Sequence, residues 1–178
     1  MPVAQTAVDA ALEILRERLE KCATARECAW ALSDAASRLF GLDDCVSYLL
    51  NSDAQTLTQV SAFGPKIKLG QMIENAITLP LGRGIVGHVA ATGVAICVPD
   101  TSTDARYIVD DEARRSELAV PIAAAHRLFG VLDSEHELAD YYQPQHVDVF
   151  ARLANAAAER MARLLDVTPT KAPITRTA

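Results

Sequence analysis

The sequence predicts an α+β fold in which helices bracket a mainly antiparallel sheet. Apolar residues recur at helical spacing near both ends of the chain, over residues 8–40 and 147–165. Between these stretches, short runs rich in Val, Ile, Leu and Thr are separated by polar and glycine-containing turns, a pattern typical of hairpins. The length of 178 residues fits one domain.

Two helices are predicted at the start of the chain. In residues 8–22, apolar side chains step by four and three positions with charged residues between them, which is typical of an amphipathic helix with a helical partner. Apolar residues keep the same spacing over residues 28–40. Gly41 follows where a glycine commonly ends a helix.

A hairpin is predicted next, over residues 45–63. Two strand-like runs flank the polar turn formers at residues 51–53. Residues 67–76 fit either a short helix or a loop that crosses the sheet, and the sequence does not decide between them.

In the second half of the chain, the sequence pattern predicts a short helix, strands and a long helix. Residues 85–92 form a two-turn helix pattern that ends at Gly93, and residues 94–100 read as a strand. Two further strand-like runs flank a turn at His126-Arg127, which indicates a second hairpin. Pro144 suits the first turn of the final helix.

Composition and charge exclude several classes of protein. The chain carries 17 Lys and Arg against 23 Asp and Glu, a net charge of −6, so it does not attract nucleic acid or anionic lipid. The charged N-terminus resembles neither a signal peptide nor a membrane span, and we expect a cytoplasmic protein. The four cysteines lack metal-site spacing, so we expect free, mostly buried thiols and no metal site.

Several motifs of the second half occur in the order of a known family. A glycine-spaced run at residues 79–93 is followed by D-x-R-Y at 104–107, S-E-x-x-V-P at 116–121 and G-V-L-D at 130–133. Together they resemble the GAF domain, a small-molecule-binding sensory module found mainly in signalling proteins. The resemblance covers roughly residues 25–165.

The GAF resemblance implies a central antiparallel sheet of about six strands flanked by helices, with the N- and C-terminal helices packed together. A ligand pocket is implied on the other face of the sheet, under loops. We therefore expect an N-terminal amphipathic dimerisation helix at residues 1–24, a GAF domain at 25–165, and a disordered tail or linker at 166–178. The implied assembly is a homodimer through the terminal helices.

The resemblance also suggests which residues meet the ligand. Arg106 either pins its own loop or contacts an anionic part of the ligand, and Glu117 either bonds loop amides or accepts a hydrogen bond from a ligand amine. We assign no catalytic residue. The full set of candidate ligand-binding residues is Cys97, Asp104, Arg106, Tyr107, Ser116, Glu117, Asp133 and Glu135.

The identity of the ligand or cofactor is unknown from the sequence. The N-K-x-F-x-D-E pattern that marks cyclic-nucleotide-binding relatives is absent, and so is the Cys-His pair common in bilin-binding relatives. No histidine is placed to serve as a haem ligand. The sequence therefore carries no metal, haem or bilin signal.

Three functions fit the sequence, and the first is preferred. The chain is expected to be a sensory domain of bacterial signalling that binds a small molecule and acts on an effector domain or a partner protein. The alternative is a non-catalytic dimerisation or interaction module. A second alternative is a free methionine-(R)-sulfoxide reductase, but charged residues at 110–115 replace the expected cysteine, and Cys97 reads as a small buried apolar residue.

Overall fold

The structure, a computed structural model, describes residues 3–64, 71–110 and 112–166. Four α-helices lie within these residues: α1 (Gln5–Glu20), α2 (Ala25–Phe40), α3 (Gly84–Thr92) and α4 (Pro144–Asp166). A single 3₁₀ turn, η1, spans Thr101–Thr103. The tail expected at 166–178 lies outside the described residues except for its first residue.

Six strands form one antiparallel sheet. Its order is β3-β2-β1-β6-β5-β4, so the two hairpins β1-β2 and β5-β6 meet at the centre and two short strands form the edges. The α+β class and the number of strands expected from the resemblance are confirmed. The strands are β1 (Cys45–Asn51), β2 (Thr56–Phe63), β3 (Thr78–Pro80), β4 (Ile96–Val98), β5 (Ser116–Ala124) and β6 (Arg127–His136).

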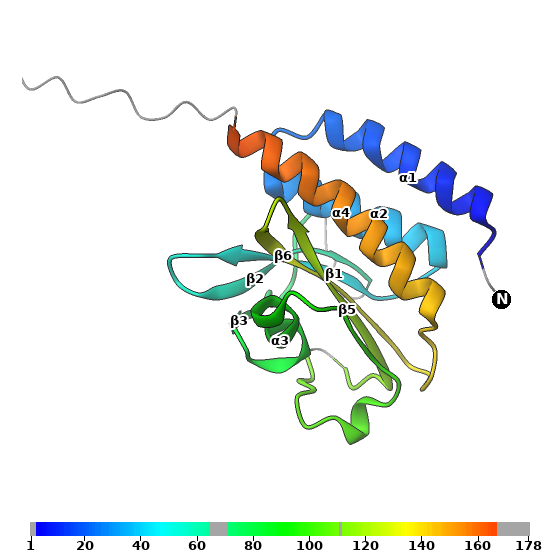
Figure 1. Ribbon diagram of the computed structural model, residues 1–178. Helices are drawn as coiled ribbons and strands as arrows, with labels where there is room; N and C mark the ends of the chain where they lie inside the picture. The colour runs from blue at the N-terminus through cyan, green and yellow to red at the C-terminus, as the bar shows by residue number, and fades with distance from the viewer. Residues whose placement is uncertain (1–2, 65–70, 111, 167–178) are drawn as a thin grey trace, which may run out of the picture.

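The two faces of the sheet are covered differently (Figure 1). Helices α2 and α4 pack on one face, and α1 lies on these two helices as an outer layer. On the opposite face, α3 and the long connection between β4 and β5 cover the sheet. Side chains alternate along a strand, so each strand contributes to both layers.

The apolar stripe of α1 is used inside the chain. Val8, Leu12, Leu15 and Leu19 are all buried, in the same apolar core as α2 and α4. The helical partner that the sequence predicts for this stripe is therefore supplied by the chain itself. Dimerisation through the terminal helices stays a prediction and would use other faces, on which Ile14 and Leu165 are exposed.

Local chemistry explains where α2 begins and ends. The Thr24 hydroxyl accepts a hydrogen bond from the Glu27 amide at 3.2 Å, and the Glu27 carboxylate accepts one from the Ala23 amide at 2.6 Å. This reciprocal pair satisfies amides that a helix start leaves without partners. At the other end, Gly41 has the left-handed conformation, with φ of 64°, as the sequence predicts.

A group of buried hydroxyls joins α2 to the first hairpin. The Ser33 hydroxyl lies 2.8 Å from that of Ser47 on β1 and 2.9 Å from that of Ser61 on β2. The Ser61 hydroxyl also donates to the carbonyl of Ala29, at 3.1 Å. These bonds fix the orientation of α2 on a face that is otherwise apolar.

The structure differs from the sequence-based expectations at two places, and it also bears on one segment that the sequence left open. The turn of the second hairpin lies at Ala125 and His126, both with positive φ, one residue before the predicted position. Strand β3 was not predicted. Residues 71–76 contain no helix, and the remainder of the segment 67–76 lies outside the described residues.

No described helix combines the length and the apolar character needed to span a membrane.

Candidate functional site

Three carboxylates converge on the sheet face that lies away from α2 and α4. Glu117 on β5 is paired directly with Glu135 on β6, and Asp133 lies two residues before Glu135, on the same face of its strand. One carboxylate oxygen from each residue lies within 4.8 Å of one from each of the others. Like charges on facing strand positions repel, so this arrangement opposes folding unless protons or cations offset the charge.

Burial changes the acid–base chemistry of these groups. Glu117 is 3% exposed and Asp133 is 4% exposed, while Glu135 is half-buried. Burial raises the pKa of Glu117 to about 8. Burial and the neighbouring charges of Glu117 and Glu135 raise the pKa of Asp133 well above its usual range. A hydrogen bond between Glu117 and Asp133 favours the proton on Asp133, so near neutral pH the pair holds at least one proton.

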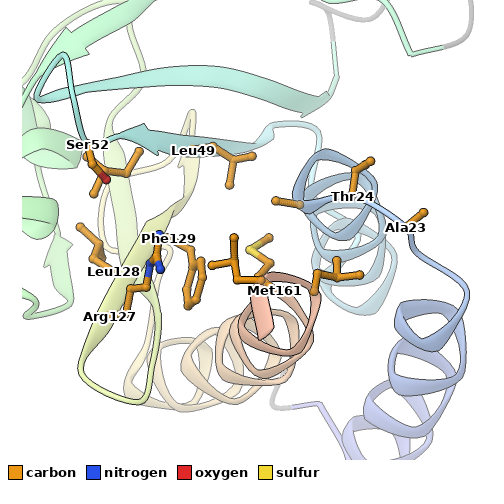
Figure 2. Close-up of a pocket in the computed structure, with 12 residues that line it drawn as sticks. Ala23, Thr24, Leu49, Ser52, Arg127, Leu128, Phe129 and Met161 are labelled. Atoms are coloured by element: carbon orange, nitrogen blue, oxygen red, sulfur yellow. The ribbon is translucent and has the colours of Figure 1, made fainter. Parts of the chain in front are cut away.

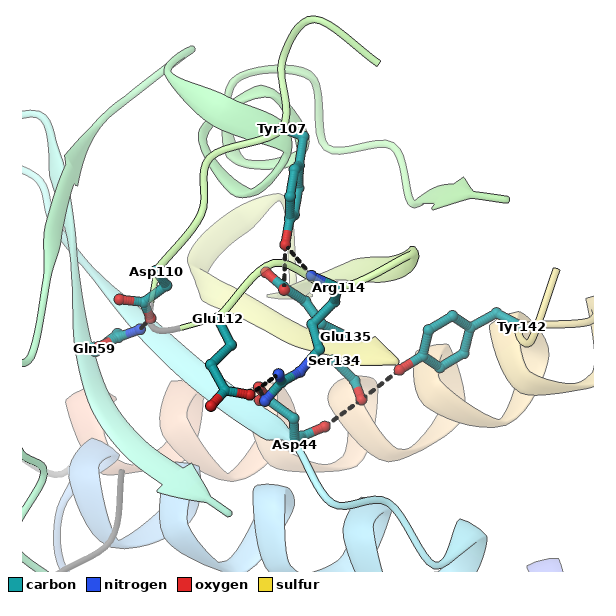
Figure 3. Close-up of polar contacts among 9 residues, drawn as sticks. All are labelled: Asp44, Gln59, Tyr107, Asp110, Glu112, Arg114, Ser134, Glu135 and Tyr142. Atoms are coloured by element: carbon teal, nitrogen blue, oxygen red, sulfur yellow. Dashed lines mark hydrogen bonds and ion pairs between the residues drawn. The ribbon is translucent and has the colours of Figure 1, made fainter. Parts of the chain in front are cut away.

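Tyr107 fastens the connection between β4 and β5 over the carboxylates. Its hydroxyl donates to the Glu135 carboxylate at 2.9 Å and accepts from the Arg114 amide at 2.8 Å. Figure 3 shows the ring reaching from the loop toward β6, with both bonds at its hydroxyl. Burial raises the pKa of Tyr107 above its usual value, so the hydroxyl keeps the proton that it donates.

Buried polar groups hold the rest of this loop in place. Gln59 on β2 donates to Asp110 on the loop and also to the Tyr48 hydroxyl, at 2.9 Å. The Arg114 guanidinium, 7% exposed, lies 2.8 Å from the Glu112 carboxylate and 3.8 Å from that of Asp44. Tyr107 thus ties one end of the segment 107–114 to the sheet, and Arg114 ties the other end to Asp44, the residue before β1 (Figure 3).

The carboxylates line a small cavity between the sheet, α3 and the loop. Its volume is about 20 Å³, which is room for one water molecule. Apolar side chains of α3, β3 and the loop form much of the wall, and Glu117, Asp133 and Glu135 supply the acidic side. One oxygen of Asp133, Oδ1, is buried and has no hydrogen-bond partner. An unpartnered buried carboxylate oxygen is costly, and a cation beside it would offset that cost.

Two further predicted site residues, Asp104 and Arg106, are not among the residues that line this cavity. Asp104 and Arg106 form an ion pair of 2.6 Å on the loop, with the Arg106 side chain 40% exposed. The Arg106 hydrogen bonds lower the pKa of Asp104 to about 2. Arg106 therefore pins the loop, as one interpretation of the sequence holds, while its charge also acts on Glu117.

Cys97 and Ser116 lie on the other face of the sheet from the carboxylates. Cys97 is paired with Leu118, which belongs to the core under the helices, and its thiol lies 3.7 Å from the Tyr142 carbonyl. Cys97 is exposed, which corrects the expectation of a buried apolar role, because β4 is an edge strand. The Ser116 hydroxyl donates to the Leu138 carbonyl at 2.8 Å and so holds the end of β6.

Sequence reasoning missed several residues that shape the site. Tyr48, Gln59 and Asp110 line the cavity or tie its loop, and Asp44 and Arg114 hold the end of the loop. The amide side chain of Gln59 inside strand β2 was the one local signal, because the other contacts depend on how strands and loop meet in space.

A larger hollow lies elsewhere, between the starts of α2 and β6 and the end of α4 (Figure 2). Its volume is about 310 Å³, and its walls are mainly apolar side chains such as Leu49, Phe129 and Met161. Arg127 lies at its edge, and none of the described residues that line it carries a carboxylate. Recognition of a polar ligand needs convergent polar groups, which the carboxylate cavity has and this hollow lacks.

Comparison with protein families identifies one match. The model of the family described as GAF domain matches residues 22–162, which is most of the chain. Among curated proteins, Protein ZMO0507 of Zymomonas mobilis subsp. mobilis (strain ATCC 31821 / ZM4 / CP4) is 33% identical over 78 residues. This match covers 43% of the chain and 48% of the relative, so the chain matches about half the length of that protein.

Solved structures share the fold. The free methionine-R-sulfoxide reductase of Neisseria meningitidis, solved with its substrate, aligns with a TM-score of 0.79 at 20% identity, covering 92% of this chain and 94% of the reductase. The GAF domain of the Acinetobacter phosphoenolpyruvate-protein phosphotransferase aligns with a TM-score of 0.79 at 16% identity, covering 94% and 99%. At these identities the likeness concerns the fold alone.

Proposed function

The chain belongs to the GAF domain family, and from this premise we propose that it is a sensory domain that binds a small molecule with a cationic group at Glu117, Asp133 and Glu135. The observation that carries the proposal is the buried Asp133 oxygen without a partner, beside two further carboxylates. A cationic ligand would give this oxygen a partner and offset the repulsion between the facing strand positions. We also propose that the protein is cytoplasmic, as we expect from the sequence.

The loop over the site would have to move to admit a molecule. The cavity of about 20 Å³ is too small for one, and the Tyr107 hydroxyl closes it against Glu135. Opening requires the Tyr107 bonds to break, and ligand contacts would replace them. The Arg106 guanidinium, whose charge acts on Glu117, would meet an anionic part of a zwitterionic ligand.

Strand β5 offers a direct path from the site to the helices. Glu117 faces the cavity, whereas its neighbour Leu118 faces the core that contains α4. Helix α4 packs on β5, and α1 packs on α4. A ligand that shifts β5 would therefore change the packing of α4 and α1, provided it prefers one arrangement by a few kcal/mol.

We propose a binding role and not a catalytic one. No thiol lines the cavity among the described residues, and Cys97 lies on the other face of the sheet. Reduction of a sulfoxide by thiol chemistry requires a thiolate that reaches the sulfur atom. A zwitterionic sulfoxide could still bind as a ligand, with its ammonium group at the carboxylates.

A thermal-shift screen with defined amines tests this function. Free amino acids, methionine sulfoxide, betaines and polyamines are added to purified protein, each in large excess. A ligand at one hundred times its Kd stabilises by about 2.7 kcal/mol, which raises Tm by roughly 5–10 °C for a chain of this size. Glu117→Gln should abolish the shift and Glu137→Gln, at an exposed glutamate, should preserve it. Equal shifts in both variants would contradict the assignment.

A further inference from the structure

The three carboxylates offer the donors of a metal site. All available atoms are carboxylate oxygens, which are the ligands preferred by Mg²⁺, Mn²⁺ and Ca²⁺. Oxygens on opposite sides of such an ion, at metal–oxygen distances of about 2.0–2.6 Å, lie about 4–5 Å apart. The three oxygens of Glu117, Asp133 and Glu135 all lie within 4.8 Å of one another, which does not exceed the span of one such ligand shell.

In the part of the chain that the structure describes, the lining of the cavity is acidic and apolar. No Lys, Arg or His is among the described residues that line the cavity. Of the two guanidiniums nearby in the loop, Arg106 is paired with Asp104 and Arg114 contacts Glu112 and Asp44. The buried Oδ1 of Asp133, a residue 4% exposed that lines the cavity, has no hydrogen-bond partner. A cation in the cavity would give this oxygen a partner.

The size of the cavity distinguishes an ion from an organic cation. About 20 Å³ accommodates one water-sized particle, so a metal ion fits while the Tyr107 bond to Glu135 stays closed. An ammonium group carries at least one carbon substituent, which requires the loop to open.

We propose that Glu117, Asp133 and Glu135 bind a hard divalent cation of the Mg²⁺, Mn²⁺ and Ca²⁺ class. This inference rests on the proposed function in that it uses the same site. The ion occupies the site with the loop closed, and an organic cation competes with it by opening the loop. The metal ion would thereby hold the domain in its closed arrangement until the organic ligand displaces it.

Titration with Mn²⁺ tests the proposal. Purified protein is stripped with EDTA, dialysed, and titrated with MnCl₂ while electron paramagnetic resonance follows free Mn²⁺. We expect one saturable site per chain. Asp133→Asn should weaken binding at least tenfold, and Glu137→Gln should leave it unchanged. Ca²⁺ or Mg²⁺ added in excess should release the bound Mn²⁺.

The outcomes separate this inference from the proposed function. Absence of saturable binding, or equal Mn²⁺ affinity in wild type and Asp133→Asn, overturns the metal site. If Mn²⁺ fails to bind but an amine stabilises the same stripped protein, the proposed function stands without the metal. If Asp133→Asn does not fold by circular dichroism, Glu135→Gln at the half-buried position replaces it, with the same expected loss of affinity.

Discussion

Replacing Glu117 with glutamine should remove much of the pH dependence of stability in the metal-free protein. In the folded chain, burial raises the pKa of Glu117 to about 8 from its ordinary value of 4.5. Below pH 4.5 both the folded and the unfolded chain hold the proton, so stability is complete. Between these pKa values the unfolded chain releases the proton and the folded chain keeps it, so the free energy of unfolding falls as pH rises.

The pKa difference sets the size of this effect. Each pKa unit corresponds to about 1.4 kcal/mol, so Glu117 alone lowers the free energy of unfolding by on the order of 5 kcal/mol between pH 4.5 and pH 8. Asp133 shifts in the same direction and adds to the decline. The Glu117→Gln variant keeps a neutral side chain of similar size and should therefore be more stable than wild type by several kcal/mol at pH 8.5.

Urea unfolding in EDTA, followed by circular dichroism at pH 5 and pH 8.5, measures this difference. The urea dependence of the unfolding free energy should be similar in both proteins, so that changes in midpoint report stability. Glu137→Gln, at an exposed position, should retain the wild-type pH dependence. Equal wild-type stability at both pH values, or an equal decline in Glu117→Gln, would refute the reasoning.

Three further variants test the packing and the loop. Gly130→Ala should cost at least about 2 kcal/mol by urea unfolding, because its Cβ would lie 1.9 Å from the Tyr48 carbonyl oxygen; an unchanged midpoint would contradict this. Ser33→Ala should cost about 1–3 kcal/mol, since it leaves two buried hydroxyls on β1 and β2 with fewer partners, and a neutral result would show that they rearrange. Tyr107→Phe should speed hydrogen exchange of the Arg114 amide, which loses its acceptor, while exchange in α4 stays as in wild type; unchanged exchange at that amide would rule out the Tyr107 contact.

The ends of the helices were predictable because a glycine or a proline at a helix end acts through its own backbone conformation. Gly41 and Gly93 end α2 and α3 in the left-handed conformation, and Pro144 begins α4, each as predicted. Strand β3 escaped prediction because three residues, Thr78–Pro80, are too few to show an alternating pattern. The apolar stripe of α1 indicated that a partner exists, but could not indicate that α2 and α4 of the same chain supply it.

The site was predictable only in part. Asp133 and Glu135 are two apart on a predicted strand, so their shared face follows from the sequence. Their meeting with Glu117 depends on the register of β5 against β6, which is set by the turn and by packing. The register of β4 against β5 places Cys97 on the other face, because it pairs Cys97 with the core residue Leu118. The contacts of the loop with β2 are long-range, so no local pattern contains them.

Native mass spectrometry of freshly purified protein tests the central claim most directly, namely that the buried carboxylates hold a cationic ligand. Wild type is compared with a Glu117→Gln/Asp133→Asn double variant, and any dissociated species is identified under denaturing conditions. We expect wild type to carry a discrete additional mass, a metal ion or a small amine, and the double variant to lack it. Bare chains in both proteins, or the same additional mass in both, would contradict the claim.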